Sequence, residues 1–464
     1  MFSRLITNPS HPFWVVSQQL FSRGVLAIKF FILAKLLGPD LFGTLTFILI
    51  GLTIIEALTE LGLQQAVVQH KEEINDKRLN VVWTLQLVRG VIIALLFYIT
   101  YYCIDKFSSF NYSQNVIITM SIIPLVKNSM SPGMFRAYRF RNFRAISIIF
   151  SIGIIVDVIL TTLLLIGSQS LIVAVLPLLV SECIKNILSY IYFPIKPTIS
   201  FDFSTINNLR RYGNWILKGS ILTVLNNQLD KILAATFLGS TALGVYQISF
   251  KLSQITISDI AVGISQYLFP TFSEKWRINK KESVILFQLS FRAIGLFSLT
   301  MVSIVWANID ILIKLVLDEN WLDVERPTQF LMINMFFGAL MSVLVPFVRA
   351  IGRPDYATKA TFLQLFVFAL TSVFLVYYFK LMGLIISIIL SITLGTIYLM
   401  ISINKEISSF IFESLKYMLK ISFVLLLIPL KFLGLNKMVI LGLSISLLFS
   451  VLYYIYVRML KKIK

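Results

Sequence analysis

Carboxylates inside apolar segments are the first residues of this chain whose type and position could do chemistry. The candidate acids are Glu56, Glu60, Asp157 and Asp230, and the first two share one predicted helix face with Thr53 and Gln64. An ionisable side chain near the centre of a bilayer costs about 2.5–3.5 kcal/mol on insertion scales, so it normally faces protein or water. We therefore expect these acids either to bind a coupling ion or to balance buried cations.

Cations inside apolar segments form a second group, and they would suit an anionic head group. The candidates are Lys29, Arg89, Lys231, Lys251 and Arg292. Lys251 lies near the middle of its apolar run and has no acidic residue within one helical turn, so a contact with substrate and a structural role are equally open. The amides expected to line the same polar space are Asn226, Asn227, Gln247 and Gln254.

Several charged residues have simpler structural explanations. Two pairs are close enough in sequence to form local ion pairs, namely Asp230 with Lys231 and Glu182 with Lys185. Three lysines lie near the ends of predicted spans, where a long side chain can reach the membrane surface: Lys127, Lys218 and Lys359. The arginines between residues 136 and 144 are typical of a topology signal that contacts lipid phosphate, although capture of a phosphorylated lipid stays open.

Motifs for enzymatic chemistry are missing from the sequence. It has no phosphate-binding loop, no Ser-His-Asp set and no glycine-rich dinucleotide turn. Two cysteines, Cys103 and Cys183, and two histidines are too few for a disulfide framework or a metal site. We therefore predict no catalytic residue, no cofactor, no metal and no ATP hydrolysis by this chain.

The composition is that of a polytopic membrane protein. Charged residues make up 14% and hydrophobic residues 57%, whereas about a quarter of a soluble protein is charged. The net charge of +19 could suggest a nucleic acid partner, but the positive residues are spread over short loops between apolar runs. This distribution is typical of the positive-inside bias, so no nucleic acid is expected.

The elements that must position the polar residues are membrane-spanning helices, each of about 20 largely apolar residues. We predict about fourteen: 14–37, 41–62, 81–103, 115–135, 145–166, 171–193, 214–237, 241–269, 286–306, 327–348, 359–379, 383–403, 416–433 and 437–457. Gly38-Pro39-Asp40 and Gly239-Ser240-Thr241 are expected to break helices. With both termini in the cytoplasm, the cytoplasmic loops hold most loop lysines and arginines, and the acidic segment 307–326 is external.

An internal repeat relates the two halves of the chain. At a constant shift of 201 residues, Trp14, Ala34, Leu37, Gly38, Gly43, Ile54, Gly62 and Gln65 recur as Trp215, Ala235, Leu238, Gly239, Gly244, Ile255, Gly263 and Gln266. A shorter similarity relates 135–138 to 348–351. We predict an N-terminal six-helix lobe in 1–200, a C-terminal six-helix lobe in 201–404 and two additional transmembrane helices in 405–464, with a hydrated cavity between the lobes.

Short sequences in both halves resemble one known family. They are LLGPDLFG at 36–43, ELGLQQAVVQ at 60–69, YGNW at 212–215, NQLDK at 227–231, LGVY at 243–246 and RAIGR at 349–353. Together they resemble the bacterial flippases of polysaccharide repeat units, which serve O-antigen, capsule and exopolysaccharide synthesis. That family belongs to the superfamily of multidrug, oligosaccharidyl-lipid and polysaccharide exporters. The resemblance implies a V-shaped, all-α fold of two six-helix lobes that works by alternating access.

The resemblance also implies a function and a location. It implies a bacterial inner-membrane flippase that moves an undecaprenyl-pyrophosphate-linked repeat unit from the cytoplasmic to the outer leaflet, driven by an ion gradient or the membrane potential. The implied partners are the lipid-linked oligosaccharide, membrane lipids, and polymerase or chain-length proteins of the same pathway. A cation-coupled multidrug exporter of the superfamily and a membrane polymerase or ligase are the alternatives. The buried cations argue against the exporter, and the short acidic segment 307–326 argues against the enzyme.

Overall fold

Helices make up almost all of the chain. The structure, a computed structural model, describes residues 9–10, 12–69, 76–105, 112–408, 410–430 and 437–463. Within these ranges there is no β-strand, and eight helices are long and apolar enough to cross a membrane. The protein is therefore an all-α polytopic membrane protein, as the sequence predicts.

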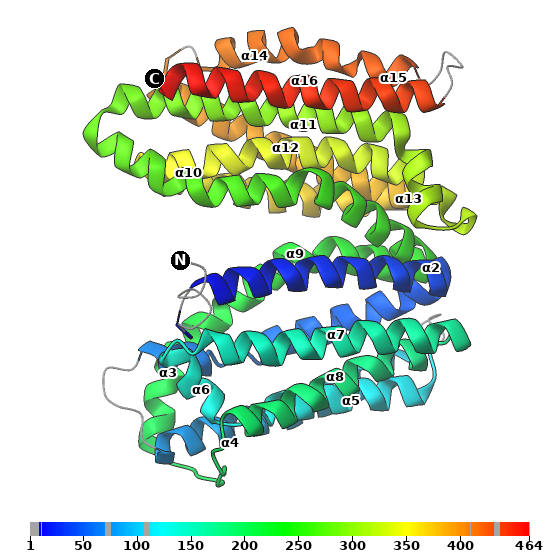
Figure 1. Cartoon of the computed structure of the whole chain (residues 1–464), viewed down its shortest axis with the longest axis vertical. Helices are drawn as coiled ribbons and strands as arrows, with labels where there is room; N and C mark the ends of the chain where they lie inside the picture. The colour runs from blue at the N-terminus through cyan, green and yellow to red at the C-terminus, as the bar shows by residue number, and fades with distance from the viewer. Residues whose placement is uncertain are drawn as a thin grey trace. The chain divides into compact units, whose positions relative to one another are not determined.

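The helices form two compact units, residues 1–244 and 245–464 (Figure 1). The boundary between the units falls inside one long helix, α9 (Phe203–Ser253). The predicted division into two six-helix lobes and a C-terminal addition rests on the sequence repeat, and it stays a prediction.

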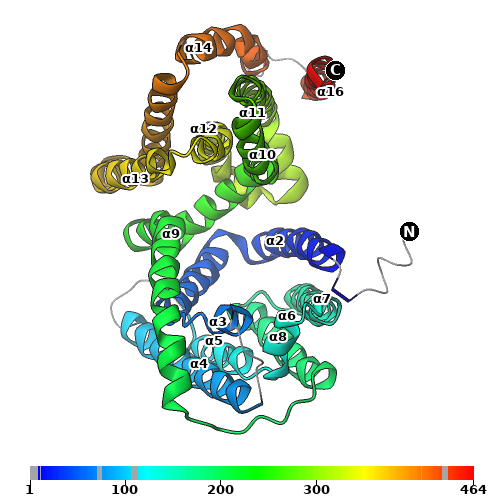
Figure 2. The same ribbon diagram turned by 90° about the vertical axis from the view of Figure 1, so that its left-hand side faces the viewer.

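The first unit is a bundle in which neighbours along the chain are not always neighbours in space. It contains α2 (Pro12–Leu58), α3 (Leu63–Gln69), α4 (Asp76–Asp105), α5 (Gln114–Asn128), α6 (Gly133–Arg139), α7 (Phe143–Gly167), α8 (Leu171–Tyr192) and most of α9. Helix α2 packs on α7, α7 on α8, α8 on α5, and α5 on α4 (Figure 2). This order brings side chains of α2, α4 and α5 together although they lie far apart in sequence.

The second unit is built around α12. It contains the end of α9, the π-helix η1 (Gln254–Ser258), α10 (Asp259–Ile278), α11 (Lys280–Val316), η2 (Glu319–Val324), α12 (Glu325–Ala350), α13 (Pro354–Glu406), α14 (Phe410–Ile421), η3 (Ser422–Leu426), α15 (Leu427–Leu430) and α16 (Lys437–Ile463). Helix α12 packs against α10, α11 and α13, and α16 packs against α11. Stacked and tilted rings of Phe287, Phe347 and Phe410 join α11, α12 and α14 in the core.

Three of the long helices are kinked at a single residue. The backbone leaves helical geometry at Gly38 (φ 72°, ψ 174°), at Gly239 (φ 85°, ψ −175°) and at Lys380 (φ 51°, ψ −130°). The first two positions are related by the sequence repeat, and glycine is the one residue that adopts such dihedrals readily. The predicted breaks at Gly38 and Gly239 are confirmed, and each is a sharp kink rather than a loop.

The repeat also explains a close backbone contact inside the first unit. A Cβ atom on Gly43 would collide with the carbonyl oxygen of Ser240, and a Cβ on Gly244 would collide with the carbonyl oxygen of Pro39. The contact is reciprocal because Pro39 and Ser240 are themselves related by the shift of 201 residues. The Ser240 hydroxyl also donates a hydrogen bond to the Asp40 carboxylate. The two glycines allow the segments after the two kinks to touch through their backbones.

The fourteen predicted spans all fall on described helices at least in part, but some of their boundaries are wrong. The span at 41–62 ends at Leu58, and the span at 115–135 is split, because α5 ends at Asn128 and a short α6 follows. The acidic segment 307–326 is largely helical, since α11 runs to Val316 and η2 begins at Glu319. How many of the fourteen cross the membrane stays a prediction.

Candidate functional site

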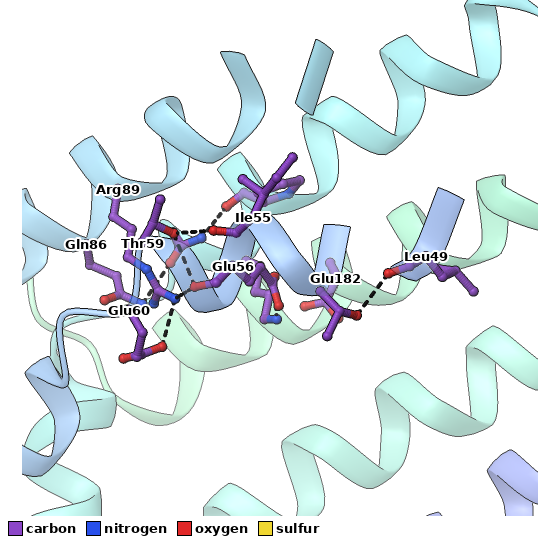
Figure 3. Close-up of polar contacts among 12 residues, drawn as sticks. Leu49, Ile55, Glu56, Thr59, Glu60, Gln86, Arg89 and Glu182 are labelled. Atoms are coloured by element: carbon purple, nitrogen blue, oxygen red, sulfur yellow. Dashed lines mark hydrogen bonds and ion pairs between the residues drawn. The ribbon is translucent and has the colours of Figure 1, made fainter. Parts of the chain in front are cut away.

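Two carboxylates of the first unit each meet a cation from a different helix. Arg89 on α4 donates through Nη2 to the Glu60 carboxylate at 2.7 Å and to the carbonyl oxygen of Glu56 at 2.9 Å. Lys127 on α5 donates through Nζ to the Glu56 carboxylate at 2.8 Å. Figure 3 shows Glu56, Glu60 and Arg89 with their neighbours. All four side chains keep some solvent exposure, so this cluster, which we call the carboxylate cluster, is polar but not sealed.

The end of α2 determines where these carboxylates lie. Thr53 and Glu56 are within the helix, and the Thr53 hydroxyl donates a hydrogen bond to the carbonyl oxygen of Leu49, one turn earlier. Glu60 lies past the end of the helix, where its carboxylate accepts the backbone N–H of Gly62 at 2.9 Å. The predicted stripe on one helix face therefore does not extend to Glu60 and Gln64, because the helix ends first.

A second ion pair is fully buried in the same unit. Lys29 on α2 donates to both carboxylate oxygens of Asp157 on α7 at 2.7 Å, and the two residues are only 5% and 4% exposed. The hydroxyl of Thr161, one turn further along α7, approaches the same carboxylate at 3.4 Å. Removing two charges from water is offset only by close pairing and further hydrogen bonds. In this structure Asp157 therefore neutralises Lys29.

The predicted local pair of Glu182 and Lys185 is confirmed. The Lys185 ammonium lies 2.8 Å from Glu182 and also over the ring of Phe150 at 5.9 Å. Its alkyl chain crosses Gly153 of α7, where a Cβ atom would collide with it. This lysine is held by packing as well as by charge, as expected of a structural residue.

The polar residues before the second kink lie on α9. Lys231 donates to the carbonyl of Asn227 and to the side chain of Gln228, both at 3.0 Å. The side chain of Asn226, which we predicted to line the polar space, lies outside the described residues. A pairing of Asp230 with Lys231 stays a prediction.

In the second unit, Lys251 lies beside the π-helix. Its ammonium approaches the side-chain oxygen of Gln254 at 3.4 Å, and among the described residues it forms no ion pair. Gln247, Lys251 and Gln254 are all partly exposed. The sequence places them on one stripe, and Gln254 is the first residue of η1. Single π-turns inside α-helices occur frequently at functional sites.

The other face of this segment is fixed to its neighbours. The buried hydroxyls of Ser249 and Ser253 approach the carbonyl oxygens of Val324 and Thr328 at 3.4 and 3.3 Å. These contacts anchor the segment against η2 and α12. Lys251 therefore lies on a helical segment that is anchored on its other face, and its ammonium forms no ion pair among the described residues.

Arg292 contacts the C-terminal helices. Its guanidinium lies 3.0 Å from the Glu413 carboxylate and 5.7 Å from the centre of the Tyr417 ring, so it links α11 to α14. Glu413 was not predicted as the partner of Arg292, and Lys127, predicted to lie at the membrane surface, instead pairs with Glu56. Neither partner has a local signal, since each pair joins distant helices.

The described residues offer no cluster suited to a metal. No group of three or more histidine, cysteine, aspartate or glutamate residues among them could hold an ion, and Cys103 and Cys183 are free thiols there.

Comparisons with known sequences relate this chain to polysaccharide biosynthesis proteins. The family model described as polysaccharide biosynthesis protein matches residues 32–326. The lipopolysaccharide biosynthesis protein WzxC of Escherichia coli (strain K12) is 22% identical over 362 residues, 74% of this chain and 70% of that protein. The teichuronic acid biosynthesis protein TuaB of Bacillus subtilis (strain 168) is 21% identical over 310 residues, 65% of this chain and 62% of that protein.

Comparisons with solved structures identify the fold. The lipid II flippase MurJ in an inward closed conformation matches with a TM-score of 0.72 at 14% identity, over 97% of this chain and 99% of that one. An inward-facing multidrug resistance MATE transporter of the MOP superfamily matches with a TM-score of 0.59 at 15% identity, over 88% of this chain and 95% of that one. This chain therefore shares its fold with both of these transport proteins.

Proposed function

Because the chain belongs to the family of polysaccharide biosynthesis proteins, we propose that it is a flippase for a lipid-linked oligosaccharide. The substrate in this proposal is an undecaprenyl-pyrophosphate-linked repeat unit, which moves from the cytoplasmic to the outer leaflet by alternating access. The observation that carries the proposal is the family match over residues 32–326, and the relative named for lipopolysaccharide biosynthesis supports the substrate class. Polymerase or chain-length proteins would then act on the product.

Lys251 is the residue we assign to the anionic part of the substrate. Its ammonium is partly exposed and has no carboxylate partner within the described residues, so it can form a charge-assisted hydrogen bond without first breaking an ion pair. Gln247 and Gln254 would supply neutral hydrogen bonds to sugar hydroxyls. By contrast, Lys29, Arg89 and Arg292 already contact carboxylates, so each would have to exchange a partner to bind substrate.

The carboxylate cluster is the part we assign to coupling. Protonation of Glu56 or Glu60, or binding of a cation there, would weaken the bonds to Lys127 and Arg89. An ion that binds one conformation better than the other shifts the equilibrium by its difference in affinity. A membrane potential supplies about 2.3 kcal/mol per elementary charge per 100 mV, so one coupled charge is sufficient to bias such a transition.

The test is a transport assay in liposomes. Purified protein is reconstituted with a fluorescent undecaprenyl-pyrophosphate oligosaccharide, and the protection of the probe from an external quencher is followed with and without a proton or sodium gradient. We expect gradient-dependent movement that falls at least tenfold in Lys251→Ala. The matched control is Lys359→Ala, which removes a largely exposed lysine near the start of α13.

Three results would contradict the proposal. Movement that is equal with and without protein would exclude flipping. Normal movement in Lys251→Ala would remove this residue from the substrate site. Export of cationic drugs with no effect on the lipid-linked probe would favour the multidrug exporter of the same superfamily.

A further inference from the structure

The turn between α6 and α7 has an unusual backbone. Arg141 lies in the left-handed region with φ 58°, which few residues other than glycine adopt. Three backbone hydrogen bonds close the turn: Phe140 N to Arg136 O at 2.9 Å, Arg141 N to Tyr138 O at 3.3 Å, and Asn142 N to Ala137 O at 2.9 Å. This pattern ends a helix in the manner of a Schellman motif, whose left-handed position is usually glycine.

The same turn occurs in the second half of the chain with glycine in that position. There, Ile351 N bonds to Phe347 O, Gly352 N to Arg349 O, and Arg353 N to Val348 O, at 3.0, 3.2 and 2.8 Å. Each of these bonds is displaced from its counterpart by 211 residues, and Gly352 has φ 80° where Arg141 has φ 58°. The second half therefore forms this turn with glycine in the left-handed position. The turn geometry alone does not explain why position 141 is arginine.

Contacts within the described structure do not explain the arginine at position 141 either. Its side chain is exposed and makes no hydrogen bond, ion pair or ring contact with any residue that the structure describes. Its neighbours differ, since Arg136 pairs with Asp76 and Arg139 donates to the carbonyl of Val67. An arginine in a strained backbone position, with no side-chain partner among the described residues, points to a ligand outside the protein.

The surroundings of Arg141 indicate which ligand. Phe140 beside it is 67% exposed, and Arg144 on the next turn is exposed with its guanidinium 5.6 Å from the centre of the Trp14 ring. An exposed aromatic ring next to cations, at the end of membrane helices, fits the boundary between lipid head groups and acyl chains. Guanidinium groups bind phosphate through paired hydrogen bonds.

We propose that the α6–α7 turn binds the phosphate of an anionic phospholipid, with Arg141 and Arg144 on the phosphate and Phe140 in the acyl-chain boundary. The equivalent turn of the second half is built for another purpose. Gly352 has no side chain, and Arg353 lies over Tyr356 and contacts Asp355 and Glu406. The hydrogen bond that Arg353 donates to the Asp355 carboxylate raises the pKa of Arg353 above its ordinary value. The lipid site is therefore specific to the first half.

Native mass spectrometry of the full-length protein tests this proposal, with phosphatidylglycerol, phosphatidylethanolamine and undecaprenyl pyrophosphate as the three probes. The informative variant is Arg141→Gly, because glycine suits φ 58° and should leave the fold intact or more stable. We expect its retention of phosphatidylglycerol to fall about fivefold, the equivalent of about 1 kcal/mol per basic residue at an anionic surface. Arg141→Lys should retain most of the binding, since it keeps the charge.

Removal of a positive charge elsewhere serves as the control. Arg277→Ala removes one exposed positive charge at the end of α10, and we expect it to leave phosphatidylglycerol retention unchanged. Equal retention by Arg141→Gly and the unaltered protein, or equal losses in Arg141→Gly and Arg277→Ala, would overturn the proposal. A third outcome would also overturn it, namely normal phosphatidylglycerol retention with loss of undecaprenyl pyrophosphate, because the turn would then serve substrate capture.

Discussion

Helices α2 and α9 share a backbone break but not their charges. Gly38 and Gly239 have nearly the same dihedrals, yet the position of Lys29 in the first helix is Asp230 in the second, and Glu56 corresponds to the buried Ile257. The glycines are kept because the kink needs them. The charges differ because each half surrounds its helix with different neighbours. The two halves therefore share the kinked backbone but not the charged side chains.

Two lysines, one in each half, show the same divergence. Lys29 is buried and bound to Asp157, whereas Lys251 is partly exposed beside Gln254 and has no ion pair within the described residues. We expect the first arrangement to stabilise the fold, and we assign the second to a ligand in the proposal above. The following predictions test this contrast.

The largest effect is expected from breaking the buried ion pair. Lys29→Ala leaves Asp157 charged and buried, and we expect it to lower the free energy of unfolding by about 3–5 kcal/mol. Thermal unfolding of the purified protein in detergent measures this. The double variant Lys29→Met with Asp157→Leu removes both charges, so it should recover much of the loss. A single variant as stable as the unaltered protein would show that the pair is not needed for the fold.

The contact between the two repeats should be the next most sensitive. Gly43→Ala drives a methyl group into the Ser240 carbonyl, and we expect a loss of about 3 kcal/mol, since backbone atoms cannot move aside easily. Gly24→Ala is the control, because it lies in the same helix with no atom near the added methyl group. That control should be neutral or slightly stabilising. If the two variants unfold alike, the close approach does not exist.

The kinks should respond equally in the two halves. Gly38→Ala and Gly239→Ala each force alanine into dihedrals that are essentially restricted to glycine, and we expect each to lose about 2 kcal/mol. Urea or thermal unfolding of the two variants side by side gives the comparison. If only one of the two variants lost stability, the two kinks would share a geometry but would not contribute equally to the stability of the fold.

The smallest effect on stability is expected at Lys251. Lys251→Ala removes a partly exposed charge whose single side-chain contact among the described residues is the 3.4 Å approach to Gln254, so the free energy of unfolding should change by about 0.5 kcal/mol or less. The same variant should lose transport in the liposome assay. Strong destabilisation would mean that Lys251, like Lys29, is a structural residue.

Much of the fold could be predicted from the sequence, because the signals for it are local. Apolar runs predict helices, Gly38 and Gly239 predict their breaks, and the three-residue spacing of Glu182 and Lys185 predicts their ion pair. The all-α membrane architecture follows from the same runs.

The partners of the site residues could not be predicted, because tertiary packing selects them. Asp157 lies 128 residues from Lys29, and Lys127 lies 71 residues from Glu56. Pairing across such separations depends on which helices become neighbours, and α2, α4 and α5 are arranged by the whole bundle. The end of α2 at Leu58 and the π-turn at Gln254 are also decided by packing rather than by a local sequence signal.

The reciprocal contact of Gly43 and Gly244 has a consequence for how the protein is made. Pro39 leaves the ribosome roughly 200 residues before the residue that packs against it, so the N-terminal segment must wait for its partner. At about 5–20 residues per second, that interval lasts about 10–40 seconds. During biosynthesis, the kinked end of α2 therefore lacks its packing partner until the start of the eighth predicted span has been made.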